Sequence, residues 1–148
     1  MKAIIIMGSS SDQAWADKIK AELDKWGLPS EAIVASAHKV PEKVFGIVKN
    51  NNKKKDLVYV TIAGRSNGLS GVVAANSVHP VIACPPFKDK EDLLVNIHST
   101  MQMPSDTPVL TVLDPSNVAA SAARMLGLGN EEMQDKVSKR IKEIKESF

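Results

Sequence analysis

Five short runs of apolar residues set the strongest constraint on the fold of this chain. The runs are rich in valine and isoleucine, and they do not alternate between apolar and polar residues. Strands that are buried on both faces of a sheet have this pattern, because both sides of the strand contact apolar neighbours. The runs therefore predict a parallel sheet covered by helices, with strands at residues 3–7, 32–35, 57–62, 81–84 and 109–113.

Segments with helical periodicity separate the five runs. In the first segment, Trp15, Ile19 and Leu23 recur on one face, and Pro41 favours the first helical position of the second. Helices are predicted at residues 12–26, from 41 to the asparagines at 50–52, and at 68–76, 90–100, 116–126 and 130–147. The alternation predicts one α/β domain over residues 1–148, a three-layer αβα sandwich with a central parallel sheet and a flavodoxin-like arrangement.

Composition argues against several classes of function. The formal net charge is only +2, and the clearest basic run, residues 53–55, is interpreted as a solvated turn before a strand. The single cysteine, Cys84, allows no internal disulfide and no CxxC metal site, and we expect it to pack in the core. No stretch approaches the ~18 apolar residues that span a bilayer. We therefore expect a cytoplasmic protein with no nucleic-acid or membrane partner.

The loop after the first predicted strand carries the strongest sign of a ligand. It contains Gly8, three serines and Asp12, and it leads into a helix. Gly8 permits close approach of the backbone, and the serine hydroxyls and free N–H groups of a helix start can surround a phosphate. Asp12 suits a sugar hydroxyl or a helix cap. Simple capping is the alternative, but capping requires one such residue rather than four, so the loop favours a phosphorylated ligand.

The loops after the second and third predicted strands reach the same edge of the sheet. The second loop contains Ser36, His38 and Lys39, which offer a hydroxyl, an acid or base and a cation. A structural role for the histidine is the alternative. The third loop, residues 63–71, holds three glycines, which indicate close backbone contact with a ligand or another chain, or simple loop flexibility.

Other motifs are absent or poorly placed. The sequence has no Walker A, GxGxxG or HExxH motif and no cysteine cluster, so neither a bound metal nor a cofactor is expected. His79 precedes a strand and His98 lies within a helix, and neither is expected in the site.

Taken together, the loops resemble those of the PurE family, the carboxylases and mutases of purine biosynthesis. The resemblance covers nearly the whole chain, and the order and spacing of five motifs fit. These are GSSSD at 8–12, SAHK at 36–39, AGRSNGLSG at 63–71, ACPP at 83–86 and QMPS at 102–105.

Within this family the chain is similar to class II, the aminoimidazole ribonucleotide (AIR) carboxylases, which use carbon dioxide directly. The AGRSN sequence after the third strand, SAHK, ACPP and LDPSN are similar to class II, whereas class I mutases carry a histidine-containing loop after that strand. Gln102 is a departure, because QMP is more similar to class I.

The resemblance implies a role for each candidate residue. Ser9, Ser11 and Asp12 would contact the ribose phosphate of the substrate, with Gly8 beside them. Ser36 and Lys39 would help to hold the phosphate, and His38 would be the catalytic acid or base. The pocket for carbon dioxide or the new carboxylate would be formed by Gly64, Ser66, Asn67 and Gly68.

The implied reaction is the carboxylation of AIR at C4 with carbon dioxide, without ATP, metal or cofactor, to give carboxyaminoimidazole ribonucleotide (CAIR). The alternatives are the class I N5-carboxyaminoimidazole ribonucleotide mutase and a non-catalytic nucleotide-binding module of flavodoxin type. The resemblance also implies a homo-octamer in which the last helix, within residues 130–148, packs on a neighbouring subunit.

Overall fold

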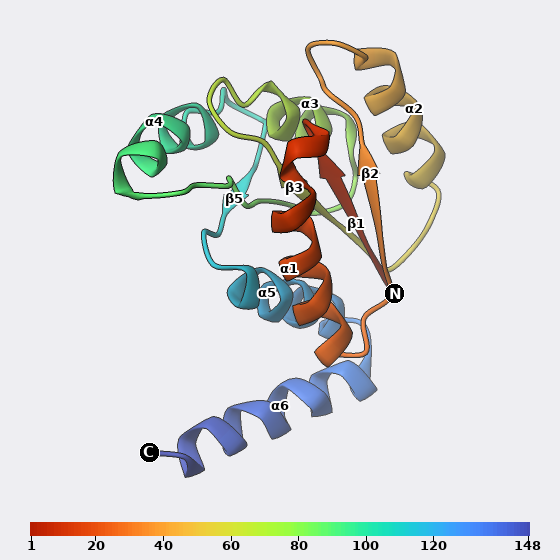
Figure 1. Cartoon of the computed structure of the whole chain (residues 1–148). Coiled ribbons are helices and arrows are strands. Elements are labelled where there is room, and N and C mark those ends of the chain that lie inside the picture. Colours follow the sequence, from red (N-terminus) through yellow and green to blue (C-terminus); the bar gives the residue numbers. More distant parts are fainter.

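The computed structural model describes all residues from Met1 to Phe148, and its centre is a five-stranded sheet. Every neighbouring pair of strands is parallel, in the order β2-β1-β3-β4-β5 (Figure 1). This order is that of flavodoxin-like folds, and the predicted fold class is confirmed. The strands are β1 Lys2–Met7, β2 Ser30–Val34, β3 Leu57–Ile62, β4 Val81–Ala83 and β5 Leu110–Thr111.

Six α-helices occupy the segments in which helices were predicted, with small differences at their ends. The first helix begins at Gln13 rather than Asp12, because residues Ser10–Asp12 form a separate 3-10 turn, η1. The helices are α1 Gln13–Lys25, α2 Pro41–Asn51, α3 Gly68–Asn76, α4 Lys90–Met101, α5 Pro115–Gly127 and α6 Glu131–Glu146.

Both faces of the central strands β1, β3 and β4 are covered, which explains their apolar runs, whereas the edge strands β2 and β5 are partly exposed. Ile5 and Met7 point into a core shared with α1 and α5, whereas Ile4 and Ile6 point into a second core with α2 and α3. All four side chains are at most 1% exposed. Since complete burial of one such side chain contributes about 1.5–3 kcal/mol, β1 is strongly held between the two helical layers.

The edge strands differ most from the prediction. The second strand covers Ser30–Val34 instead of 32–35, and the fifth covers only Leu110–Thr111 instead of 109–113. The fifth strand pairs only with Ile82 and Ala83 of β4. β4 itself is short because Pro80 precedes it and Pro85 soon follows it, and a proline has no N–H to donate to a neighbouring strand.

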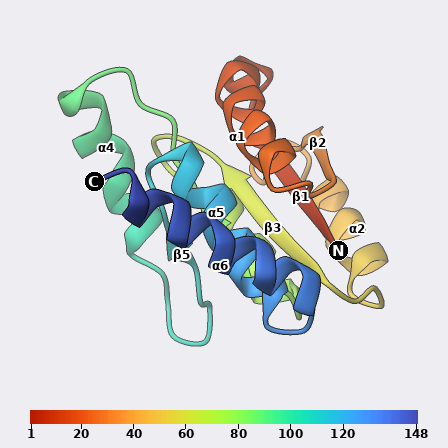
Figure 2. The same cartoon turned by 90° about the horizontal axis from the view of Figure 1, so that it is seen from below.

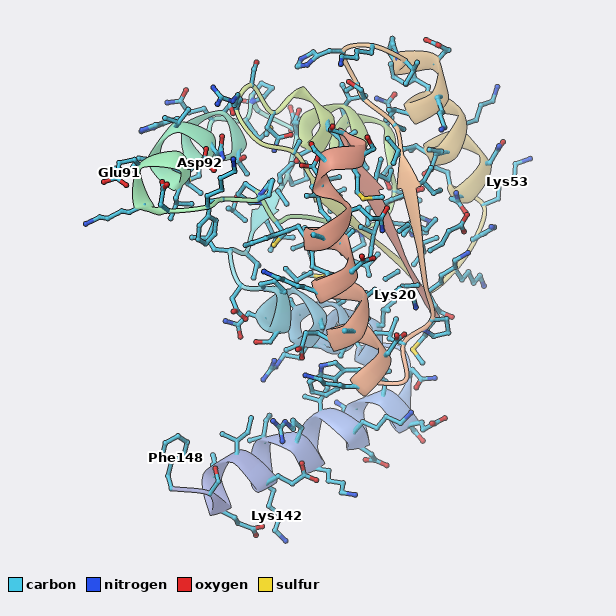
Figure 3. The ribbon with its side chains drawn as sticks, viewed as in Figure 1. Lys20, Lys53, Glu91, Asp92, Lys142 and Phe148 are labelled. Carbon is cyan, nitrogen blue, oxygen red and sulfur yellow. The ribbon has the colours of Figure 1, made fainter.

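The last helix packs on α5 (Figure 2), and its C-terminal end lies away from the body of the domain (Figure 1). Met133 and Val137 of this helix are buried, but Ile141 and Ile144, on the same apolar stripe, are 37% and 44% exposed. Figure 3 shows Phe148 at the far end of this helix, away from the sheet. No helix of the chain combines the length and the apolar character that a membrane span requires.

A buried polar network ties β3, α3 and α4 together. Asn67 caps α3: its side-chain oxygen accepts the N–H of Ser70 at 3.1 Å. The Asn67 amide donates to the hydroxyls of Ser70 and Thr100 at 2.8 and 3.0 Å. Thr61 of β3 completes the network through a 2.8 Å hydrogen bond between its hydroxyl and that of Ser70. The network fixes the start of α3 relative to the sheet.

We therefore expect Asn67→Ala to lower the free energy of unfolding by about 1–3 kcal/mol, because the helix cap is lost and buried hydroxyls lose a donor. Urea unfolding followed by circular dichroism measures the change. The control is Asn76→Ala at the exposed end of the same helix, which removes one amide and should alter stability by less than about 0.5 kcal/mol. Equal stability of the two variants would contradict the network.

Candidate active site

A cavity of about 560 Å³ lies beyond the carboxyl ends of the strands. This size is typical of sites for small ligands. Nine of the eleven residues predicted from the sequence line it, and only Lys39 and Asn67 do not. The nine are Gly8, Ser9, Ser11, Asp12, Ser36, His38, Gly64, Ser66 and Gly68.

The topology of the sheet accounts for the position of the cavity. After β1 the chain turns to α1 on one face, and after the neighbouring β3 it turns to α3 on the other face (Figure 1). The two connections diverge, which leaves a crevice at the carboxyl ends of these strands. Gly8 lies in the crevice, where a Cβ atom would be 3.5 Å from the Cβ atom of Ala63. The two loops therefore approach each other closely.

The serine-rich loop is both a helix start and a wall of the cavity. The hydroxyl of Ser9 accepts the N–H of Ser11 at 3.2 Å, and the carboxylate of Asp12 accepts the N–H of Ser9 at 3.1 Å. This is a capping box, so the capping role considered for these residues is present. The hydroxyl of Ser11 donates to that of Ser9 at 2.8 Å, and both residues also line the cavity. Burial raises the pKa of Asp12, and the hydrogen bond from Ser9 opposes that shift.

His38 lies in the turn that follows β2. Ser36 supports the turn by accepting the N–H of Lys39 at 3.3 Å, and the Lys39 side chain itself is exposed. The imidazole packs directly on Gly68, where a Cβ atom would come within 2.8 Å of His38 Nε2. The absence of a side chain at residue 68 therefore allows the ring to lie against the start of α3.

The loop between β3 and α3 uses its backbone N–H groups in two different ways. The N–H groups of Arg65 and Asn67 donate to Asn96 and Ser99 of α4, at 2.6 and 2.9 Å. No protein acceptor pairs with the N–H groups of Gly64, Ser66 and Leu69. These three residues line the cavity, whereas the Asn67 side chain turns into the buried network. The cavity wall beside His38 is therefore rich in available donors.

Several residues that line the cavity were not predicted as site residues, among them Trp15, Arg65, Phe87 and Lys88. Arg65 and Lys88 line the cavity, whereas Lys39 is not among the lining residues. A cation inside the glycine-rich loop at a strand end was the signal that could have identified Arg65. Trp15 was assigned to the apolar stripe of its helix, although its ring also packs on Phe87, with centroids 5.3 Å apart.

Cys84 supports this wall from inside the core. It accepts a hydrogen bond from the indole N–H of Trp15 at 3.3 Å and is fully buried. Burial raises the pKa of its thiol to about 11, so the thiol is neutral at ordinary pH. The packing role expected for this cysteine is confirmed.

The basic run and the two other histidines considered in the sequence lie outside the cavity. Lys53 is exposed in the loop after α2, in agreement with the interpretation of its basic run as a solvated turn (Figure 3). His79 precedes β4 at the opposite edge of the sheet, where its ring lies 3.1 Å from the carbonyl oxygen of Asn51. No group of three or more histidine, cysteine, aspartate or glutamate side chains is arranged to hold a metal ion.

Comparisons with known proteins agree with the site. The model of the AIR carboxylase family matches residues 2–147. A phosphoribosylaminoimidazole carboxylase of Archaeoglobus fulgidus is 46% identical, over 93% of this chain and 75% of that protein. The protein of the same name from Treponema denticola is 42% identical, over 90% and 84%. A bifunctional carboxylase and succinocarboxamide synthetase of Drosophila melanogaster is 42% identical, but the chain spans only 30% of it.

Solved structures lead to the same family. The crystal structure of Treponema denticola PurE superimposes with a TM-score of 0.90 at 38% identity, over 98% of this chain and 92% of that one. A match to an enzyme family over almost every residue overturns the alternative of a non-catalytic binding module of flavodoxin type. The chain belongs to the AIR carboxylase (PurE) family of enzymes of purine biosynthesis.

Proposed function

We propose that this chain carboxylates AIR at C4 with carbon dioxide to give CAIR, as a class II member of its family. One observation carries the proposal: the imidazole of His38 lies against Gly68, beside the unpaired N–H groups of Gly64, Ser66 and Leu69. An acid or base thus lies next to a group of donors in one cavity. The names of the carboxylase relatives and the Arg65-containing loop support the class II assignment.

The carbon–carbon bond forms between the substrate ring and carbon dioxide. The aminoimidazole ring is electron-rich at C4, as an enamine is, and can attack carbon dioxide without ATP or a cofactor. Negative charge then develops on the two oxygens of the new carboxylate. The N–H groups of Gly64, Ser66 and Leu69 are donors suited to this charge, and such fixed donors stabilise a transition state strongly. Holding carbon dioxide beside the ring supplies a further part of the rate.

Loss of a proton completes the reaction. After attack, C4 carries both its original hydrogen and the carboxylate, and the ring regains aromaticity when that proton leaves. His38 is the base that we assign to this step, because imidazole accepts protons near neutral pH and its Nε2 atom lies at the cavity wall. The pair of electrons from the C–H bond returns to the ring.

The ribose phosphate anchors the substrate far from the reacting carbon. We assign the phosphate to Ser9, Ser11 and Ser36, with Lys39 at the exposed rim, and a ribose hydroxyl to Asp12. Arg65 and Lys88 add positive charge to the cavity wall. Binding energy from this remote group positions the ring for the chemical step. With one buried thiol, the chain suits the reducing cytoplasm in which we place it.

The mutase is the second candidate, because Gln102 is more similar to class I. Gln102 follows α4 directly, and its side chain is exposed. It does not line the cavity, so the residue that favours the mutase does not contact the proposed reaction centre.

The assay that separates the two reactions supplies purified protein with AIR and bicarbonate, without ATP. We expect CAIR to form, followed by its absorbance, and N5-carboxyaminoimidazole ribonucleotide to be a poor substrate. Conversion of the N5-carboxy isomer with no carboxylation of AIR would replace the class II proposal with the mutase.

Gly68→Ala tests the position of His38. The new Cβ atom would be 2.8 Å from Nε2, so the imidazole must move away from α3. Misplacement of a catalytic group by about 1 Å costs roughly 100-fold, and we expect a loss of kcat of that order. Gly46→Ala in α2 is the matched control, because no atom lies within 4 Å of its added Cβ, and it should keep full activity.

His38→Asn extends the same prediction by removing the base itself. We expect the variant to bind AIR and to lose turnover by about 10²–10⁴-fold, the usual contribution of a general base. Isothermal titration with AIR and steady-state kinetics measure the two properties. Substantial turnover by His38→Asn would remove this residue from the mechanism.

We also infer the homo-octamer implied by the family resemblance, with the last helix on a neighbouring subunit. The exposed Ile141 and Ile144 continue the stripe that Met133 and Val137 begin. Lys142, which lies between them in the sequence, is on the part of the helix that is away from the sheet in Figure 3. Light scattering should therefore give a mass eight times the 16.0 kDa of one chain. Ile141→Glu should lower that mass, and a monomeric wild-type protein would contradict the inference.

A further inference from the structure

Asn96 of α4 connects two loops of the cavity with the two ends of one amide. Its Oδ1 atom accepts the N–H of Arg65 at 2.6 Å, and its Nδ2 atom donates to the carbonyl of Pro86 at 2.9 Å. The side chain lines the cavity and the residue is only 3% exposed. Asp92, four residues earlier on the same face of α4, also lines the cavity and is labelled in Figure 3.

The two hydrogen bonds of the Asn96 amide reach two different loops of the site. Arg65 belongs to the loop after β3, which carries the unpaired donors, and Pro86 belongs to the loop after β4. The Asn96 amide also lies beside Gly64, where an added Cβ atom would be 3.3 Å from Oδ1. Asn96 therefore holds the two loops at a fixed separation.

The loop after β3 requires such support. Arg65 has a φ of +46°, in the left-handed region that non-glycine residues seldom adopt. Residues persist there when the surrounding structure determines their conformation. Ser99, three residues after Asn96, adds a second connection, since its hydroxyl donates to the Arg65 carbonyl and accepts the Asn67 N–H at 2.9 Å.

These hydrogen bonds affect which backbone N–H groups of the loop after β3 are free to face a ligand. Because Arg65 and Asn67 turn their N–H groups to α4, the N–H groups of Gly64 and Ser66 remain available at the cavity wall. We propose that Asn96 is a positioning residue, which orients the donors for carbon dioxide and the new carboxylate through the backbone of Arg65. The proposal rests on the carboxylase function proposed above.

An amide is required for this role because one end must accept and the other must donate. Aspartate has nearly the same size and would still accept the Arg65 N–H, but its second oxygen would face the carbonyl oxygen of Pro86. Asn96→Asp therefore removes one connection and adds a repulsion between two acceptors. Ser99→Ala removes only the neighbouring connection.

The experiment measures carboxylation kinetics with AIR and bicarbonate varied separately. For Asn96→Asp we expect kcat/KM for carbon dioxide to fall about 100-fold, the effect of a displacement near 1 Å, with the KM for AIR unchanged. A smaller change of the same kind is expected for Ser99→Ala. Asn76→Ala, at the exposed end of α3, is the control and should match wild type in both parameters.

The outcomes separate this role from a general structural one. A loss of folded protein would lower kcat only in proportion to the number of AIR-binding sites, which titration calorimetry counts, whereas the proposal requires a lower kcat/KM for carbon dioxide at each remaining site with the KM for AIR unchanged. Thermal melting identifies folded variants, and folded Ser99→Ala and Asn96→Asp with wild-type kcat/KM for carbon dioxide per site would overturn the proposal. If the wild type itself makes no CAIR from AIR and bicarbonate, the proposed function fails instead.

Discussion

The parallel pairing of β1 with β3 is the interaction on which the rest of the structure depends. The two strands pair along their whole lengths, and the N–H of Gly8 extends the pairing by donating to the Ile62 carbonyl at 2.8 Å. Both strands are covered by helices on both faces, so their register is fixed by two cores at once. The loops that follow them are consequently held close together. The position of the site follows from the packing of its two central strands.

The arrangement of the fold was predictable because its signals are local. The apolar run of β3 was predicted with its observed bounds, Leu57–Ile62, and so was α3, Gly68–Asn76. Prediction was poorest for β5, where the apolar run extends beyond the two paired residues. The length of an edge strand depends on its neighbour, and the prolines around β4 limit that neighbour. Sequence periodicity indicates which residues of a strand are buried, but not how many of them pair with the neighbouring strand.

The residues of the candidate site also differ in whether the sequence alone could identify them. Strand-end loops such as Gly8–Asp12 and the turn at His38 were predicted because the carboxyl ends of parallel strands meet at one edge. Asn96 was not, because its importance comes from a hydrogen bond to a residue 31 positions earlier in the chain. No motif or spacing marks such a contact. Asn67 shows the reverse case, in which a residue inside a recognised motif has its side chain in the buried network rather than in the cavity.

Asparagine side chains at residues 67 and 96 explain how a short loop can be rigid and still present free donors. A glycine-containing loop alone would sample many conformations, since glycine is conformationally permissive. Here the amide of Asn67 fixes the end of the loop to α3, and the amide of Asn96 fixes its beginning to α4. Each amide satisfies a donor and an acceptor through two separate atoms in one plane, whereas a hydroxyl does both through one oxygen and a carboxylate only accepts. The backbone N–H groups between and beside these two points are thereby held in place before a ligand arrives, and fixed donors need no reorganisation when charge develops beside them.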